Sequence, residues 1–297
     1  MTRRHRARSI DELKTIQMKV FGGAAQIAGQ SPPLAIRPDD VVITPFSKSG
    51  TTWLQQIFHQ LRTGGDMDFD DISRVVPWIE MAPMEGIDLN AEQRATPRGF
   101  KSHEPYDRLP PGGRYINSVR HPADVAWSLF KFMEGWFIEP GALTPDEFVQ
   151  SNFLANDNYF DHFLSYWQVR DQENVLILSY EGMLEDPAGT IERVANFCGI
   201  PLDEALFQRV LERSSIDYML QYKDRFDDAI LRAITEEEIL PPGSDSAKVR
   251  QGTAGQHAAG LSAHTIEAIE QKWQEKIGGP LGFATYEDLR VAIPAAG

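Results

Sequence analysis

Residues 47–52, Ser-Lys-Ser-Gly-Thr-Thr, have the composition of a loop that binds an anion. The loop lies between an apolar run and a helical pattern, so its backbone N–H groups are exposed at the positive end of a helix dipole. Lys48 adds a full positive charge, and Gly50 lets the backbone approach a ligand closely. Simple helix capping needs only one hydroxyl group. Anion binding is the better interpretation, because hydroxyl donors come from Ser49, Thr51 and Thr52.

The position of the lysine distinguishes this loop from the common nucleotide-binding loop. The pattern GxxxxGK[ST] places its lysine directly after the last glycine, whereas Lys48 precedes Gly50. A P-loop kinase or NTPase would also end an apolar strand with a Walker-B carboxylate, and neither signature is clear in this chain. We keep this enzyme class as an alternative.

A second anion-binding point is predicted in residues 116–130, INSVRHPADVAWSLF. Arg120 ends a predicted strand, where a side chain faces the crevice in which open α/β sheets bind ligands. Its guanidinium fork suits a phosphate, and Ser128 adds a hydroxyl group. For this segment alone, a salt bridge between Arg120 and Asp124 or another carboxylate is an equally good interpretation. The presence of the first loop favours two anion-binding points.

Lys101 and His103 could act together in the segment FKSHEP, residues 100–105. They are two residues apart at the end of a predicted strand, so their side chains point to the same side. A lysine beside a histidine lowers the histidine's pKa and keeps the ring neutral, able to accept a proton. A lone histidine is more often structural, but the lysine and the strand-end position favour a general base.

Alternating strand and helix patterns must position these residues. Near-continuous apolar runs, such as 41–46 and 174–180, are typical of strands covered on both faces. We therefore expect a single α/β domain with a mostly parallel central sheet, helices on both faces and a P-loop-like strand-turn-helix. The predicted strands are 41–46, 98–103, 114–119 and 174–180, and the predicted helices are 50–61, 122–133, 159–170, 188–200 and 262–276.

The 297 residues divide into a short N-terminal part and one domain. Residues 1–30 are expected to be a tail and lead-in, with the basic first residues frayed and solvated. Residues 31–297 are expected to form the domain. Within it, the stretch from about 224 to 262 is rich in glycine, proline, serine and charge, which predicts a long lid-like loop.

Composition argues against several classes of protein. The net charge of −14 argues against nucleic-acid binding, which needs a basic face. The basic start has no apolar core of a signal peptide, and no window of about 18 apolar residues predicts a membrane span. We therefore expect a cytoplasmic protein without stable membrane insertion. Cys198 is the single cysteine and the histidines lack ligand spacing, so neither a disulfide nor a metal site is expected.

Five segments together resemble the motifs of the cytosolic sulfotransferases. TPFSKSGTTW (44–53) is similar to the family's 5′-phosphosulfate loop, close to YPKSGTTW, and SVRHPADVAWSLF (118–130) is similar to its 3′-phosphate motif. FKSHEP (100–105) resembles the family's Lys-Thr-His segment. LSYEGMLEDP (178–187) resembles its Tyr-Glu-Asp-Met segment, and VRQGTAG (249–255) resembles its Arg-Lys-Gly loop. The segments follow the family's order over roughly residues 40–260, and we expect a bacterial member.

The resemblance implies an enzyme that uses 3′-phosphoadenosine 5′-phosphosulfate (PAPS) and releases 3′-phosphoadenosine 5′-phosphate (PAP). The sulfuryl group would pass in line to an acceptor hydroxyl or amine without a metal, by analogy with phosphoryl transfer. His103 would be the general base, and Lys48 and Lys101 would offset negative charge. Trp53 would stack on adenine, and Tyr180, Ser214 and Ser215 would lie near the adenosine. The implied phosphate ligands are Lys48, Ser49, Gly50, Thr51 and Thr52 for the 5′-phosphosulfate, and Arg120, Ser128, Arg250 and Gly252 for the 3′-phosphate.

The chain departs from the family pattern at several positions. Gln251 replaces the basic residue beside Arg250, which removes one positive charge, and Ser102 replaces a threonine. Ile216 stands where an aromatic residue often accompanies the adenine, and the Gly-Asp-Trp continuation is here GQHAAG. The Lys-Thr-Val dimer motif is not visible, so the resemblance predicts no oligomeric state.

Two stretches dense in aromatic residues and methionine predict an apolar acceptor pocket, VPWIEMAPM (76–84) and KFMEGWF (131–137). Core packing explains any single one of these residues at least as well. The acceptor would be a small molecule or lipid-like compound, such as a phenol, a sterol-like alcohol or a lipid-linked sugar. A non-catalytic PAP-binding protein is a further alternative, which an intact His103 and Lys101 oppose. The candidates are Phe46, Trp78, Met81, Met84, Phe132, Met133, Trp136 and Phe137.

Overall fold

A parallel four-stranded sheet lies at the centre of the computed structural model, which describes residues 6–229, 231–233 and 248–293. Its strands are β1 (Val41–Ile43), β2 (Gly99–Lys101), β3 (Arg114–Val119) and β4 (Val175–Ser179), in the spatial order β2-β1-β3-β4. The predicted parallel sheet is confirmed. β1 is shorter than the predicted strand 41–46 because Pro45 has no N–H to continue the ladder and the chain turns there.

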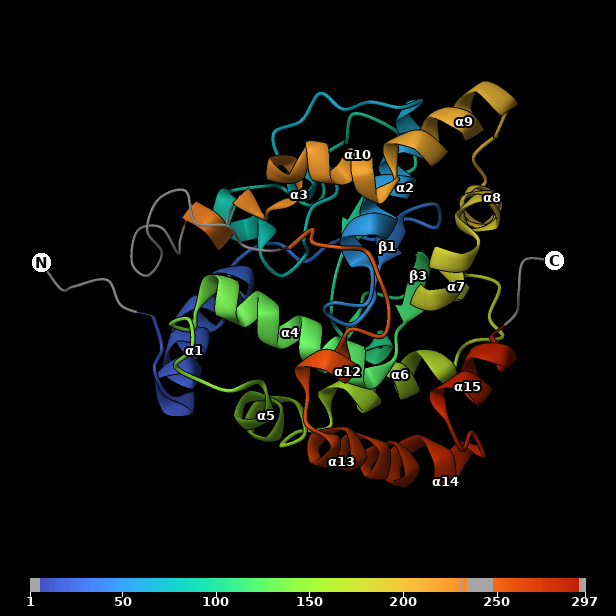
Figure 1. Cartoon of the computed structure of the whole chain (residues 1–297). Helices are drawn as coiled ribbons and strands as arrows, with labels where there is room; N and C mark the ends of the chain where they lie inside the picture. The colour runs from blue at the N-terminus through green and yellow to red at the C-terminus, as the bar shows by residue number, and fades with distance from the viewer. Residues whose placement is uncertain (1–5, 230, 234–247, 294–297) are drawn as a thin grey trace, which may run out of the picture.

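Two apolar cores cover the two faces of the sheet. Val41 and Ile43 of β1 pack into one core, and Val42 between them packs into the other, as the alternation of side chains along a strand requires. The first core is closed by α2 (Thr51–Thr63), α8 (Pro187–Cys198) and α9 (Glu204–Arg213). The second is closed by α4 (Pro122–Trp136), α6 (Asn158–Trp167) and α13 (Ala263–Trp273). Figure 1 shows the first group above the sheet and the second below it.

Shorter elements connect and extend these layers. α15 (Tyr286–Ala292) closes the second core near the C-terminal end, where Leu289 is fully buried. The remaining short helices and helical turns are α3 (Ile72–Val75), η1 (Ala82–Glu85), η2 (Tyr106–Arg108), α5 (Pro145–Phe148), η3 (Val149–Phe153), α7 (Tyr180–Glu185), α10 (Ile216–Gln221), η4 (Lys223–Phe226), α12 (His257–Gly260), η5 (Gln274–Gly278) and α14 (Gly279–Leu281).

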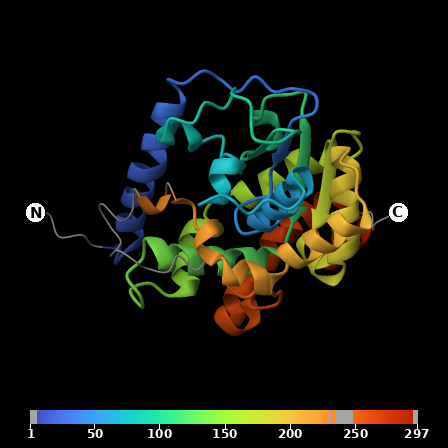
Figure 2. The ribbon, with the colours of Figure 1, turned by 90° about the horizontal axis from the view of Figure 1, so that it is seen from above.

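Residues 6–28 are folded against the domain, which differs from the tail and lead-in expected over 1–30, and residues 1–5 lie outside the described residues. Helix α1 (Ile10–Ala28) lies at the left of both Figure 1 and Figure 2, and its residues Leu13 and Val20 are buried. Before it, the N–H of Ala7 donates to the carbonyl of Phe137 at 2.7 Å. The physical reason is that apolar side chains at helical spacing follow the basic residues and bury a stripe against the end of α4.

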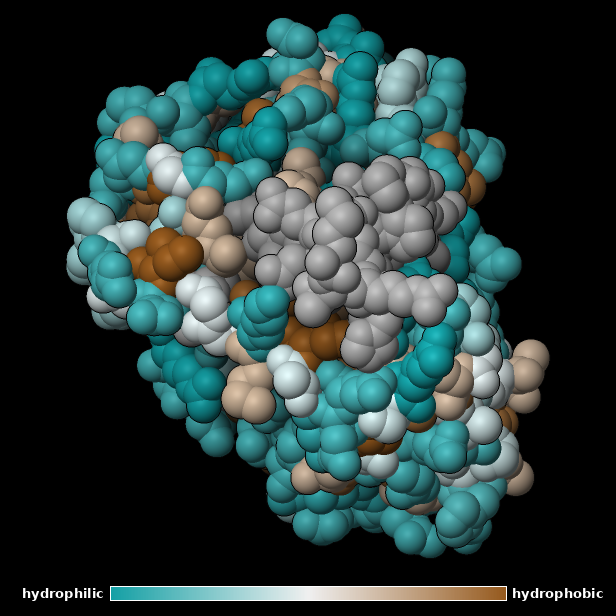
Figure 3. Space-filling model, turned by 90° about the vertical axis from the view of Figure 1, so that its left-hand side faces the viewer, coloured by the Kyte–Doolittle hydropathy of each residue, from teal (hydrophilic) through white to brown (hydrophobic). Residues whose placement is uncertain are grey.

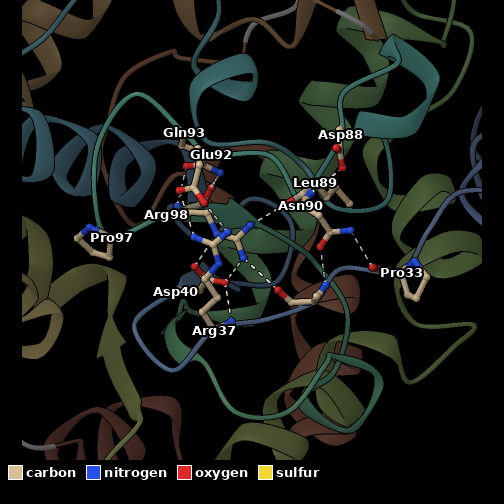
Figure 4. Close-up of polar contacts among 12 residues, drawn as sticks. Pro33, Arg37, Asp40, Asp88, Leu89, Asn90, Glu92, Gln93, Pro97 and Arg98 are labelled. Carbon is tan, nitrogen blue, oxygen red and sulfur yellow. Dashed lines mark hydrogen bonds and ion pairs between the residues drawn. The ribbon is translucent and has the colours of Figure 1, made fainter.

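A buried ion pair ties together the two segments that lead into β1 and β2. The guanidinium of Arg98 donates to both carboxylate oxygens of Asp40, at 2.9 and 2.5 Å. Figure 4 shows the surrounding contacts, in which Arg37 pairs with Glu92 and Asn90 donates to the carbonyl of Pro33. Because a buried charge is costly without a partner, this pair fixes the register in which the two strands begin.

Hydrophilic residues cover most of the coloured surface in Figure 3, and hydrophobic residues form small separate patches there.

In the region predicted as a long loop, 224–262, residues 234–247 lie outside the described residues. The described part of that region contains η4 and α12. Across the part of the chain that the structure describes, no helix is both long and apolar enough to cross a membrane.

Candidate active site

A cavity of about 860 Å³ opens at the carboxyl ends of β1, β2 and β3. From β1 the chain moves outward to β2 and then crosses back to β3, so a topological switch point lies between β1 and β3. Open α/β sheets bind ligands in the crevice at such a point. The loop after β1, the end of β2 and the residue after β3 all reach this cavity, together with parts of α1, α4, α10 and the segment 248–256.

We refer to residues 47–52 as the anion loop. Two of its residues have left-handed backbone conformations, Lys48 with φ of 69° and Gly50 with φ of 97°. Gly50 is the N-cap of α2, and a Cβ there would lie 3.0 Å from Cδ2 of Tyr180, so a side chain at this position would require the tyrosine to shift. The loop is therefore a tight turn whose backbone passes directly beneath Tyr180.

Several polar atoms of this region are buried and have no hydrogen-bond partner among the described residues. They include the hydroxyl oxygens of Ser49 and Thr51, the indole nitrogen of Trp53 and Nε of Arg120. Native proteins leave few such atoms unpaired. Since all four residues belong to the predicted donor set and three of them line the cavity, with Ser49 buried behind, the unpaired atoms indicate a polar ligand.

Lys48 carries its charge in an unfavourable setting. Burial first, and then the positive charges of Lys248, Arg250 and Arg120, lower the pKa of its ammonium group to about 7. Its Nζ lies 4.6 Å from the centre of the Phe132 ring. So many cations around one cavity create a strong attraction for an anion.

Arg120 lies between the anion loop and the segment 250–257. It donates to the carbonyl of Lys48 at 2.9 Å and to the carbonyl of Thr253 at 3.1 Å, and its guanidinium stacks 4.3 Å from the Tyr180 ring. Ser128 lines the same cavity from α4. The alternative salt bridge with Asp124 is not present, because the Asp124 carboxylate accepts from segment 255–257 instead.

Asp124 fixes the segment that carries Arg250 and Gly252. Its carboxylate accepts from the N–H of Gly255 at 2.6 Å and from the N–H and Nδ1 of His257 at 3.1 and 2.8 Å. Gly252 has φ of 57°, and a Cβ on it would lie 3.0 Å from the side chain of Ile216. The segment around GQHAAG is thus anchored on α4, and Ile216 packs against Gly252.

Ser214 and Ser215 line the cavity next to α10, but their hydroxyl groups have local partners. Ser214 donates to the carbonyl of Val210 at 2.7 Å, and Ser215 donates to that of Glu212 at 2.7 Å while capping α10. Their hydroxyl groups therefore donate to backbone carbonyls at the junction between α9 and α10.

His103 lines the cavity with a defined tautomer. Its Nδ1 lies 2.8 Å from the carbonyl oxygen of Pro45, which can only accept, so Nδ1 carries the hydrogen and Nε2 is the acceptor. Burial, and then the charge of Lys101, lower the pKa of the ring to about 3. The imidazole is therefore neutral and packs edge to face on Trp78, with ring centres 5.3 Å apart.

Sequence reasoning missed an ion cluster beside His103. Lys101 Nζ lies 3.3 Å from Asp228 Oδ1, and Lys248 Nζ lies 2.5 Å from Asp228 Oδ2. All three residues line the cavity. Lys248 stands two residues before Arg250, which is a usable sequence signal, whereas nothing in the sequence around Asp228 indicates its position.

The apolar acceptor candidates divide between the cavity and the core. Trp78, Phe132 and Met133 line the cavity, and Phe21 of α1, which sequence reasoning missed, lines it too. The other candidates do not reach it within the described residues. Met81, Trp136 and Phe137 are buried core residues, Phe46 packs edge to face on Tyr159 and His162, and Met84 packs beside Met81. In the described ranges, no group of three or more acidic, histidine or cysteine side chains could hold a metal ion.

Comparisons with known proteins agree on one family. The family model described as sulfotransferase domain matches residues 38–280. Mouse sulfotransferase 1B1 is 32% identical over 258 residues, which cover 82% of this chain and 84% of that protein. Rat sulfotransferase 1C2 is 26% identical over 257 residues, with coverage of 82% and 84%.

Solved structures share the fold. Retinol dehydratase in complex with androsterone and the inactive cofactor PAP superposes with a TM-score of 0.66 at 23% identity, over 86% of this chain and 84% of that one. Mouse sulfotransferase SULT7A1 complexed with PAP gives a TM-score of 0.62 at 20% identity, over 93% of each chain. Because the family model spans most of its length, this chain belongs to the sulfotransferase domain family.

Proposed function

We propose that this member of the sulfotransferase family transfers the sulfuryl group of PAPS to the hydroxyl group of an apolar small molecule, with His103 as general base. One observation carries the proposal. A single cavity joins the anion loop 47–52, Arg120 and a neutral buried histidine. Anion-binding groups and a proton acceptor in one cavity suit transfer of an anionic group to a protic acceptor.

The donor end of the cavity would hold PAPS through the residues that the motifs single out. The unpaired hydroxyl group of Thr51 and the charge of Lys48 would receive the phosphosulfate, whereas Ser49, expected from the motif as a ligand, is buried and does not line the cavity. Arg120, Ser128 and Arg250 would receive the 3′-phosphate, and Trp53 and Tyr180 would lie at the adenosine. Support comes from the two structural neighbours that hold PAP.

The proton transfer in this reaction would depend on the neutral imidazole of His103, whose Nε2 is the acceptor nitrogen. Its Nε2 would take the proton of the acceptor hydroxyl as the acceptor oxygen bonds to sulfur and the bond from sulfur to the bridging phosphate oxygen breaks. The products are a sulfate ester and PAP. Lys48 and Lys101 would offset the negative charge that develops on the leaving phosphate and on the transferring group.

The acceptor would be an apolar alcohol or phenol, and an amine is the alternative acceptor. Phe21, Trp78, Phe132 and Met133 give this end of the cavity an apolar wall. The structural neighbour retinol dehydratase binds androsterone in one structure and retinol in another, both apolar alcohols, which supports a sterol-like or lipid-like acceptor here.

The remaining alternatives are less well supported. A kinase or NTPase lacks its lysine signature here, since Lys48 precedes Gly50. A non-catalytic PAP-binding protein has no need of a neutral histidine beside a lysine in the cavity. We further propose a cytoplasmic location. A bacterial origin stays a prediction, because the two reported curated relatives are from mouse and rat.

Transfer of labelled sulfate from PAPS to a panel of phenols, sterols and glycolipids tests the proposal. The wild-type chain should label at least one apolar acceptor, and His103→Ala should lower the rate about 10²–10⁴-fold. Undiminished transfer by this variant would exclude His103 as the base.

Thermal stabilisation by PAP tests the donor site separately from catalysis. PAP should raise the melting temperature of the wild-type chain, and Arg120→Ala should remove most of this increase. Adenosine 5′-phosphate is the matched control ligand, and equal stabilisation by both nucleotides would contradict the 3′-phosphate assignment.

A further inference from the structure

Asp228 is a buried carboxylate in the wall of the cavity, and no sequence motif includes it. Its side chain is satisfied on both oxygens. Oδ1 accepts from the hydroxyl of Ser73 at 2.6 Å and lies 3.3 Å from Lys101 Nζ, and Oδ2 lies 2.5 Å from Lys248 Nζ. Three donors on one carboxylate form a defined polar site.

The backbone holds this carboxylate in place. Asp228 has a left-handed φ of 52°, a conformation that aspartate tolerates better than most residues. The N–H of the next residue, Ala229, donates to Asp71 Oδ2 at 3.0 Å, and Asp71 also caps α3. The segment containing Asp228 is therefore fixed to α3 from both its side chain and its backbone.

Lys101 is held between this carboxylate and an aromatic ring. Its Nζ lies 4.1 Å from the centre of the Trp78 ring, and the side chain is 2% exposed. The charged groups that act on it are Asp228 and Asp71, which favour the ammonium, and Lys248, which opposes it. Burial lowers the pKa of Lys101 to about 8, and the Asp228 carboxylate limits this decrease.

Asp228 and Lys101 are both ionised. Burial alone would raise the pKa of Asp228, but Lys101 and Lys248 outweigh it and hold the pKa well below its ordinary range. Lys101 in turn helps to lower the pKa of His103, and the negative charge of Asp228 opposes this decrease.

We propose that Asp228 is a positioning residue for sulfuryl transfer, because its carboxylate keeps the Lys101 ammonium charged and fixed beside His103. Asp228 acts through Lys101 and makes no contact with the reacting atoms. This inference rests on the proposed function, since it assigns Lys101 and His103 to that reaction. Without Asp228, the ammonium would lose its proton at lower pH and the cluster would no longer hold it above the Trp78 ring.

The pH dependence of kcat with saturating PAPS tests this role in Asp228→Asn. Both limbs of the profile should move to lower pH, the alkaline limb by about 1–3 units, because a negative charge near both Lys101 and His103 is lost. A lower kcat with unmoved limbs would overturn the proposal, since it indicates a merely structural role. Asp228→Glu should restore the limbs towards their wild-type positions.

Two further variants keep the test decisive. Asp224→Asn is the matched control, because Asp224 is an exposed aspartate of η4 that does not line the cavity, and both limbs of its pH profile should stay in place. Lys248→Met removes the competing cation, so the alkaline limb should move to higher pH. If Asp228→Asn does not fold, an unmoved limb in Lys248→Met overturns the proposal.

Competitive labelling with acetic anhydride, read by peptide mass spectrometry, reports the pKa of Lys101 without any turnover. In Asp228→Asn the pKa of Lys101 should fall, and that of Lys48 is read separately from its own peptide. An unchanged Lys101 pKa contradicts the inference even where transfer is measured. Absence of transfer in the wild-type chain, with the expected labelling shift, contradicts only the proposed function.

Discussion

Nδ1 of His103 donates to the carbonyl oxygen of Pro45 at 2.8 Å, which joins the end of β2 to the turn after β1. Pro45 lies three residues before Lys48, so the candidate base and the anion loop are held together by one hydrogen bond. The bond also decides the tautomer, because the carbonyl accepts and leaves Nε2 as the basic nitrogen. The hydrogen bond thereby fixes the ring of His103 relative to the turn that carries Lys48.

Lys101→Met should move the acid limb of the pH profile of kcat/KM to higher pH. The reason is that burial and the charge of Lys101 both lower the pKa of His103, to about 3, so removal of the charge raises it. A raised pKa means that the base is protonated, and inactive, at a higher pH. The control is His264→Ala on the exposed face of α13, which should leave the limb in place. An acid limb that stays fixed in Lys101→Met contradicts the assignment.

Binding of PAP should take up protons at about pH 8. The pKa of Lys48 is lowered to about 7 in the free protein, so much of this lysine is neutral above that pH, and an anionic ligand favours its charged form. Calorimetric titration in two buffers of different ionisation enthalpy measures the uptake. Lys48→Met should reduce it, whereas Lys14→Met on the exposed face of α1 should not. Equal uptake in both variants would place the titrating group elsewhere.

Gly50→Ala should weaken PAP binding about tenfold or more, equal to about 1.4 kcal/mol. Its Cβ would meet Tyr180 at 3.0 Å, and the left-handed backbone itself costs about 1–2 kcal/mol of folding stability. Gly64→Ala at the other end of α2 is the matched control, because Gly64 is also left-handed but has no atom within 4 Å of a Cβ. Both variants should lose stability in thermal melts. Only Gly50→Ala should lose affinity, and equal affinities would show that the anion loop tolerates the methyl group.

Asp124→Asn should weaken PAP binding more than it lowers kcat, because Asp124 anchors the segment that carries Arg250 and Gly252. Burial would raise the pKa of Asp124, but its hydrogen bonds from His257 and Gly255 lower it to about 2. A lowered pKa contributes stability above the ordinary aspartate pKa of about 4, and that stability is lost as the pH falls towards 2. Acid unfolding of the two forms checks this sign, and the same acid midpoint in the variant would contradict it.

Local patterns in the sequence were sufficient for the sheet and for the turn at residues 47–52 that leads into α2. β3 occupies residues 114–119, as predicted, and α4 begins at Pro122, as its proline indicates. These features depend on short-range chemistry, in which apolar runs, a helix-starting proline and a glycine turn act on neighbouring residues. For the same reason, the ends of the predicted strands pointed to Lys48, Lys101, His103 and Arg120, and all four line the cavity.

Local patterns predicted the apolar wall of the cavity only in part, because they identified Trp78, Phe132 and Met133 but not Phe21. Phe132, Met133 and Trp136 lie on adjoining positions of α4, yet only the first two line the cavity. Trp136 is buried, and the guanidinium of Arg232, remote in sequence, lies 5.3 Å from its ring centre. Helical periodicity identifies an apolar stripe, but the elements packed against that stripe decide which part remains open.

Short contiguous motifs were enough to predict the family, the α/β fold and the residues at the strand ends. Three further features follow from tertiary packing: α1 is part of the folded body, Phe21 reaches the cavity, and Asp228 pairs with Lys101 across 127 positions. The physical reason is that burial and ion pairing depend on distances in space, which no local spacing of residues encodes.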